Sequence, residues 1–248
     1  MKKLSFIFAL ILGASIFLTG CNSDNSTADT QNENQLSIYT TVYPLQYMAE
    51  QIGGEHVNVS SIYPAGVDEH TFEPTQKDII NIAESDLFYY VGYNLEGFVN
   101  NVTKTLGNEN VEMIAIGEKV NLDTPGHEEH EHEDHEHEDD GHNHGTVDPH
   151  LWIDPLYAKE MAEHIKDTLI EKMPEQKSAF EANYETLAKK FDELNTEYTK
   201  VFSEASHDEF LVSHAAFGYW EERYDVEQIS VSGISTSEEP TQKSLEKL

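Results

Sequence analysis

The sequence has 248 residues, of which 47 are acidic and 15 are basic, so its formal net charge at pH 7 is −32. Proteins that bind nucleic acid need clustered lysine and arginine, and this composition therefore excludes a nucleic-acid partner and favours cations. Cys21 is the only cysteine, which excludes an internal disulfide.

The N-terminus has the pattern of a secretory signal peptide. Two lysines precede an apolar run that ends in Leu18-Thr19-Gly20-Cys21, and this run is shorter than the ~20 apolar residues of a spanning helix. Small residues followed by cysteine are typical of a bacterial lipobox, whereas an uncleaved anchor would leave the cysteine unexplained. We expect residues 1–20 to be removed, Cys21 to be lipidated, and the polar residues 21–35 to tether the protein outside the cytoplasmic membrane.

From residue 36, short apolar runs alternate with helical patterns. Strands are expected at 36–40, 57–62, 87–91 and 111–116, and helices from Pro44 to Gly53, after Pro74 and over 95–106. In the helix after Pro74, we expect Ile79, Ile80 and Ala83 to face inward. The β-α-β-α alternation predicts an α/β protein with a parallel sheet flanked by helices, and we assign residues 36–155 to an N-terminal lobe.

A low-complexity insertion at residues 121–145 interrupts this alternation. Its tract from His127 to His144 contains nine carboxylates and seven histidines, which are His127, His130, His132, His135, His137, His142 and His144. These imidazoles are candidates for weak binding of several zinc ions, which would concentrate the metal or signal its abundance. The alternative is a solvated linker whose histidines merely tolerate metal.

Two helices are predicted over residues 156–205. The first ends at Pro174, and the second is long and repeats an apolar residue every three or four positions, so that one face is buried. The apolar positions of that face are Phe180, Tyr184, Leu187, Phe191, Leu194, Tyr198 and Val201. These helices are expected to link the N-terminal lobe to a C-terminal one.

A second strand-helix unit begins at Phe210. The pentapeptide Glu73-Pro74-Thr75-Gln76-Lys77 recurs as Glu239-Pro240-Thr241-Gln242-Lys243, with a strand, a turn and a helix upstream of each copy. The repeat predicts two similarly built lobes. Because one strand-helix unit cannot bury its own faces, we expect residues 206–248 to be the incomplete start of a C-terminal lobe.

Three histidines stand out by their context. His70 lies in a loop between a strand and a helix, His150 lies within Asp148-Pro-His-Leu-Trp-Ile-Asp-Pro155, and His214 directly follows a predicted strand. Loops after parallel strands gather at one edge of a sheet, where ligands bind. Imidazoles suit tetrahedral Zn²⁺, but ordinary loop histidines remain an equal alternative. The histidines without such a context are His56, His164 and His207.

Several motifs together resemble one known family. They are the lipobox, the loop from His70 to Thr75, the Asp148-Pro-His-Leu-Trp segment preceded by an acidic histidine tract, and His214-Ala-Ala-Phe-Gly-Tyr. Residues 36–248 are similar to the zinc-uptake branch of the metal-binding solute receptors of ABC transporters. The resemblance implies two lobes joined by one long rigid helix.

The same resemblance implies a function. It makes His70, His150 and His214 the ligands of Zn(II), and it makes the protein a monomeric, non-enzymatic receptor that delivers zinc to an ABC permease and its ATPase. Family members usually take a fourth, carboxylate ligand from the second lobe, beyond the end of this sequence. Glu69 and water are the candidates within it.

Other functions remain open at this stage. A manganese receptor or adhesin of the same family is one alternative, although manganese-binding relatives tend to carry a carboxylate at the position of His214. A zinc hydrolase is another, because three histidines and a water also describe a catalytic site. The sequence contains no His-Glu-x-x-His motif, which weakens the hydrolase alternative.

Overall fold

The computed structural model describes residues 35–122 and 147–236. These residues belong to one compact unit, Asn34–Leu248. The predicted signal peptide, Cys21, the histidine-rich tract and the second copy of the pentapeptide, Glu239 to Lys243, lie outside the described residues. Within the described ranges, no helix combines the length and the apolar character needed to cross a membrane.

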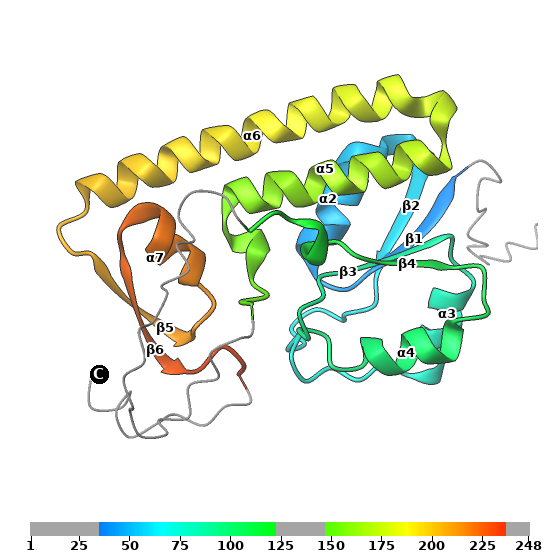
Figure 1. The fold of residues 1–248 in the computed structure, drawn as a ribbon, viewed down its shortest axis with the longest axis horizontal. Coiled ribbons are helices and arrows are strands. Elements are labelled where there is room, and N and C mark those ends of the chain that lie inside the picture. The colour runs from blue at the N-terminus through cyan, green and yellow to red at the C-terminus, as the bar shows by residue number, and fades with distance from the viewer. Residues whose placement is uncertain (1–34, 123–146, 237–248) are drawn as a thin grey trace, which may run out of the picture. The chain divides into compact units, whose positions relative to one another are not determined.

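The larger of two sheets is parallel throughout. Its strands are β1 (Leu36–Thr40), β2 (Val57–Ser61), β3 (Leu87–Tyr90) and β4 (Glu112–Ala115), in the order β2-β1-β3-β4. Ile38 on β1 lies opposite Val59 on one side and Leu87 on the other. Helices α2 (Tyr43–Gly53), α3 (Gln76–Ala83) and α4 (Val99–Leu106) connect the strands (Figure 1). The predicted α/β class is therefore confirmed.

Successive residues of β3 belong to two separate cores, because side chains alternate between the faces of a strand. Leu87 and Tyr89 pack on the α2 side of the sheet with the later helix α5 (Pro155–Lys172). Phe88 packs on the opposite side with residues of α3 and α4. All three side chains have no exposed surface, and a strand buried on both faces is expected in a sheet covered by helices.

The helix after Pro74 is rotated from our expectation. Ile80, predicted to face inward, is 55% exposed, whereas Ile82 is fully buried. Ile79 and Ala83 do pack against the core, and positions 79, 82 and 83 share one face of a helix. The side chain of Thr75 caps α3 and forms a capping box with Asp78, which fixes where this helix begins.

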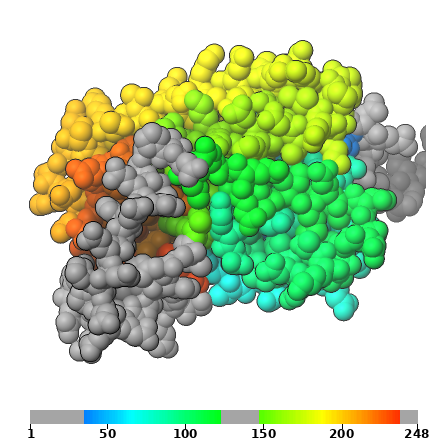
Figure 2. Space-filling view, in the orientation of Figure 1, coloured from blue at the N-terminus to red at the C-terminus, as the bar shows by residue number. Residues whose placement is uncertain are grey.

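A long helix, α6 (Lys177–Glu204), packs beside α5 and extends past it toward the smaller of the two sheets (Figure 1). Phe180 and Leu187 are buried against α2 and α5. Val201, predicted to be buried, is 54% exposed. Near this end of α6, Tyr198 and Phe202 pack against the short helix α7 (Gly218–Tyr224). In the space-filling view, α6 forms one edge of the molecule (Figure 2).

The smaller sheet is a pair of parallel strands, and α7 connects one strand to the other. Strands β5 (Glu209–His214) and β6 (Glu227–Ser232) pair directly. Aromatic side chains join this unit to α6: the ring of Phe202 lies 5.3 Å from that of Trp220 and 5.2 Å from that of Tyr224. These contacts connect the strand that carries His214 to the long helix.

Candidate metal centre

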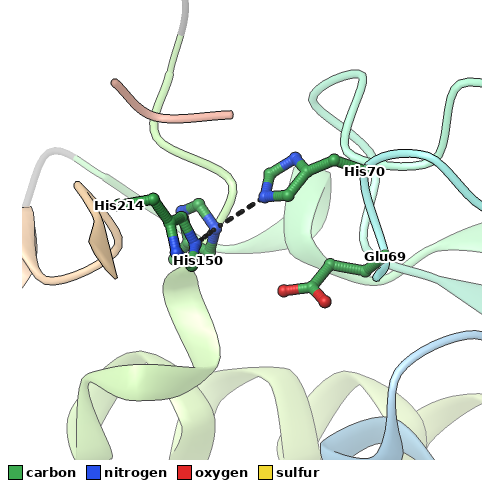
Figure 3. A group of neighbouring side chains, drawn as sticks. All are labelled: Glu69, His70, His150 and His214. Atoms are coloured by element: carbon green, nitrogen blue, oxygen red, sulfur yellow. Dashed lines mark hydrogen bonds between the residues drawn. The ribbon is translucent and has the colours of Figure 1, made fainter. Parts of the chain in front are cut away.

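Three chain segments bring four candidate ligands together. Glu69 and His70 lie in the loop after β2, His150 lies just before α5, and His214 is the last residue of β5. One ligand atom from each of the four lies within 4.8 Å of the others. Figure 3 shows His150 and His214 side by side, with His70 and Glu69 facing them from the other side.

The distances between the imidazoles match those expected around one metal ion. Nε2 of His150 lies 3.3 Å from Nε2 of His70 and 3.4 Å from Nε2 of His214. Nitrogen ligands placed 2.0–2.1 Å from a tetrahedral Zn²⁺ are separated from one another by about 3.3–3.4 Å. The nitrogens of His70 and His214 therefore each lie at the distance from that of His150 which one tetrahedral ion requires, and all three lie within the 4.8 Å limit of the cluster.

His150 is the most rigidly held member of the cluster. Its side chain is only 1% exposed, and Oδ1 of Asp148 accepts hydrogen bonds from its backbone N–H at 2.9 Å and from Nδ1 at 2.7 Å. A proton on Nδ1 leaves the lone pair of Nε2 directed at the cluster. Asp148 thus fixes the orientation and tautomer of the imidazole.

The loop that carries Glu69 and His70 is held by Asp68. Oδ1 of Asp68 accepts from the backbone N–H of His70 at 2.9 Å, and its Oδ2 accepts from the hydroxyl of Thr236 at 2.6 Å. Burial opposes ionisation of Asp68, but the hydrogen bonds from Thr236 and from His70 lower the pKa of its carboxyl overall. The hydroxyl of Tyr63 donates to the carbonyl oxygen of Glu69 at 3.3 Å.

Burial favours the neutral imidazoles of His70 and His214. Burial lowers the pKa values of both His70 and His214, and the neighbouring His150 lowers them further. Metal ions bind neutral imidazole, so a lowered pKa leaves both nitrogens available at pH 7 without loss of a proton.

The other three described histidines lie away from the cluster, as expected. His56 packs its ring against Phe180 at 5.8 Å, His164 lies on α5 at 4.0 Å from a carboxylate oxygen of Glu160, and His207 is exposed. The seven histidines of the tract lie outside the described residues.

Supporting residues on α7 and after β6 were not identified from the sequence. Thr236 gives no signal, because isolated threonines are common on surfaces. Arg223, which pairs with the buried carboxylate of Asp154 at the start of α5, does give a signal. It is the only arginine in the chain, and arginine is the residue best suited to pair with a buried carboxylate.

A parallel α/β fold with three imidazoles and a carboxylate at one point defines this molecule as a metal-binding α/β protein. The comparison with known proteins gives the family. The chain belongs to the family of zinc-uptake complex component A periplasmic proteins (ZnuA), whose sequence profile matches residues 38–248.

Relatives and solved structures agree with this assignment. The chain is 34% identical over 249 residues to the zinc-binding lipoprotein AdcA of Streptococcus pneumoniae, covering 100% of this chain and 48% of that protein. It is 33% identical over 249 residues to the high-affinity zinc uptake system protein ZnuA of Bacillus subtilis, covering 100% and 76%. The crystal structure of the Zn(II)-bound ZnuA-like domain of Streptococcus pneumoniae AdcA superposes with a TM-score of 0.67 at 30% identity, covering 86% of this chain and 73% of that one. The chain thus spans about half the length of AdcA.

Proposed function

We propose that this protein is an extracytoplasmic receptor that captures Zn(II) through His70, His150 and His214 and delivers it to an ABC permease and its ATPase. The observation that carries the proposal is that Nε2 of His150 lies 3.3 Å from Nε2 of His70 and 3.4 Å from Nε2 of His214, which fits ligands of one tetrahedral ion. Membership in a zinc-uptake family supports it.

Zinc is the preferred metal because the cluster offers three imidazole nitrogens. Manganese is better served by carboxylate and water oxygens, and among the described residues only Glu69 adds a carboxylate to this cluster. For the fourth ligand, Glu69 and water are the candidates among these residues, and a carboxylate from the second lobe is the alternative that the family resemblance implies. The zinc-binding names of the relatives and the Zn(II)-bound neighbour support the same metal.

Cys21 is the proposed lipid anchor, with residues 21–35 as the tether and the tract from His127 to His144 as an auxiliary low-affinity zinc site. We also propose the division into lobes over 36–155 and 206–248, linked by helices over 156–205. The lipoprotein name of the AdcA relative supports the anchor.

Competitive zinc titration tests the site. We compare the unchanged protein with a variant lacking residues 127–144, with His214→Ala, and with His207→Ala as a control at an exposed histidine outside the cluster. The expected result is one tight site that survives loss of the tract and tolerates His207→Ala. His214→Ala should weaken it by more than the ~10–100-fold typical of outer-sphere partners.

Tight binding that disappears with the tract and ignores His214→Ala would instead identify a chelating surface lipoprotein. Delivery is tested by growth of a deletion strain under zinc limitation, where normal zinc uptake without the protein contradicts the transport role. Turnover of esters or peptides by the zinc-loaded protein would support a hydrolase.

A further inference from the structure

Helix α7 forms hydrogen bonds with both ends of the segment that carries His150. The hydroxyl of Tyr219 donates to the carbonyl oxygen of Asp148 at 2.6 Å, and Nε1 of Trp220 donates to the carbonyl oxygen of Ile153 at 2.9 Å. Asp148 and Ile153 flank His150 on its two sides. These bonds therefore fix the main chain of the segment at residues 148–154 from outside it.

A buried ion pair adds a third attachment. Nε of Arg223 donates to Oδ2 of Asp154, a carboxylate with no exposed surface. The guanidinium also lies 5.3 Å from the centre of the Tyr157 ring, and that ring packs edge-on against Tyr219 at 5.0 Å. The only arginine of the chain thus joins α7 to the start of α5. A lysine lacks the planar group that can pair with Asp154 and lie against the Tyr157 ring at once.

The start of α7 lies close to the carboxylate that orients His150. A Cβ atom added at Gly218 would lie 3.1 Å from Oδ2 of Asp148, tighter than an ordinary van der Waals contact. Gly218 follows His214 by only four residues, so α7 is the shortest covalent path from His214 to the contacts with the His150 segment.

From this geometry we infer that α7 positions the metal centre: Tyr219, Trp220 and Arg223 are positioning residues that set the separation of His150 and His214. The inference rests on the proposed function, because it concerns two of the proposed zinc ligands. The chain of contacts runs from the Tyr219 hydroxyl to the main chain of Asp148, then from the Asp148 carboxylate to Nδ1 of His150. Helix α7 touches neither ligand imidazole through these bonds and acts by restricting where they lie.

Two matched variants test the inference in the full chain. Tyr219→Phe removes the hydroxyl bonded to Asp148, whereas Tyr224→Phe removes a hydroxyl of the same helix that donates to Oδ1 of Asn195 on α6 at 3.0 Å. The two tyrosines are similarly buried, at 6% and 9% exposure. A merely structural role predicts the same outcome for both variants.

Three quantities are measured for each variant: the zinc dissociation constant by chelator competition, the thermal unfolding midpoint without metal, and the visible absorption of Co(II) bound in place of zinc, which reports ligand geometry. We expect Tyr219→Phe to weaken zinc about tenfold, at the lower end for residues that orient metal ligands, and to change the Co(II) spectrum. Tyr224→Phe should leave both unchanged. Equal zinc affinities and spectra for the two variants overturn the inference.

Arg223→Lys provides a second test if Tyr219→Phe does not fold. It keeps the charge but removes the planar group, and we expect weaker zinc binding and an altered Co(II) spectrum, whereas an unaltered spectrum and affinity overturn the inference. Failure of the proposed function is distinguishable, because in that case the unchanged protein itself would not show a tight site that His214→Ala weakens.

Discussion

His150 shows how one side chain can be fixed by a residue two positions away in the sequence. Asp148, two positions earlier, accepts both the backbone N–H and Nδ1 of His150. This short-range arrangement decides which ring nitrogen faces His70 and His214. The orientation of the most buried candidate ligand is therefore set locally, before the rest of the cluster assembles.

Replacing Asp148 tests that local control. Asp148→Ala removes the acceptor for Nδ1, and we expect zinc affinity to fall by about 10–100-fold because the imidazole loses its fixed tautomer and orientation. Competitive titration measures the change. Asp192→Ala is the control, since Asp192 pairs with Lys159 on the surface at 2.7 Å, away from the cluster. Equal affinity for both variants would show that Asp148 does not orient the ligand.

The pH dependence of zinc binding follows from the lowered pKa values of His70 and His214. Both lie below the ordinary value of 6.5, chiefly because the rings are buried. The neutral forms of these two residues persist as the pH falls, so protons compete with zinc at His70 and His214 only below about pH 6.5. We expect affinity measured by chelator competition to be nearly flat between about pH 7.5 and 6.5 and to fall steeply below that range.

The stability of the metal-free protein should follow the same groups. A histidine whose folded pKa is lowered binds its proton first in the unfolded state, so these two residues reduce the free energy of unfolding as the pH falls below 6.5. Urea unfolding of His214→Ala against the unchanged protein measures the contribution of His214. In the zinc titration, an affinity that already declines between about pH 7.5 and 6.5 would contradict the lowered pKa values of these two histidines.

At the scale of elements, α5 begins where it does because of a single side chain. Oδ1 of Asp154 accepts from the backbone N–H groups of Leu156 at 2.8 Å and Tyr157 at 3.0 Å, and Pro155 occupies the first helical position. These are the usual requirements of a helix start. Because Asp154 also pairs with Arg223, the same residue begins one helix and attaches another.

Asp154→Ala should therefore be costly. We expect the free energy of unfolding to fall by about 3 kcal/mol, the lower end for a broken buried ion pair, because Arg223 retains some exposure to water. Asp154→Asn keeps an oxygen for the helix cap, so its loss should be smaller by the ~1 kcal/mol of a cap. Urea denaturation measures both variants, and equal losses would mean that the cap contributes nothing.

At the scale of the whole molecule, α6 packs against the main core near its start and against α7 near its end. Near its start, Phe180 is fully buried between α2 and α5, and Nδ2 of Asn183 donates to the carbonyl oxygen of Ile52 at 2.9 Å. Near its end, Tyr198 and Phe202 pack against the aromatic side chains of α7. The position of His214 relative to the larger sheet thus depends on both ends of one helix.

Two substitutions separate these ends. Phe180→Ala should lower the global free energy of unfolding by about 3–5 kcal/mol, as expected for a buried phenylalanine. Phe202→Ala should instead raise hydrogen exchange in β5 and β6 while α5 remains protected, because the Phe202 ring packs against Trp220 and Tyr224 of α7. Exchange that rises equally in β5, β6 and α5 would show that the smaller sheet and the main core unfold together.

Much of the fold follows from local patterns in the sequence. The strands and helices from β1 to β4 lie within a few residues of their predicted ranges, because apolar spacing, prolines and glycine pairs mark their ends. The face of a helix is harder to predict: Ile80 and Val201 match the apolar spacing, yet each is exposed. Neither error is visible locally, because burial depends on which elements cover each face.

The sequence by itself determined the α/β class and singled out His70, His150 and His214 as candidate ligands from the context of each residue, with Glu69 as one candidate for a fourth. It also held the signal for Asp148, which lies two positions from its partner. Only the tertiary structure brought the four ligand atoms within 4.8 Å of one another, since they come from three segments up to 145 positions apart. It alone attached Tyr219 and Arg223 to the His150 segment, because a contact between distant segments depends on how the elements pack and leaves no periodic pattern in the chain.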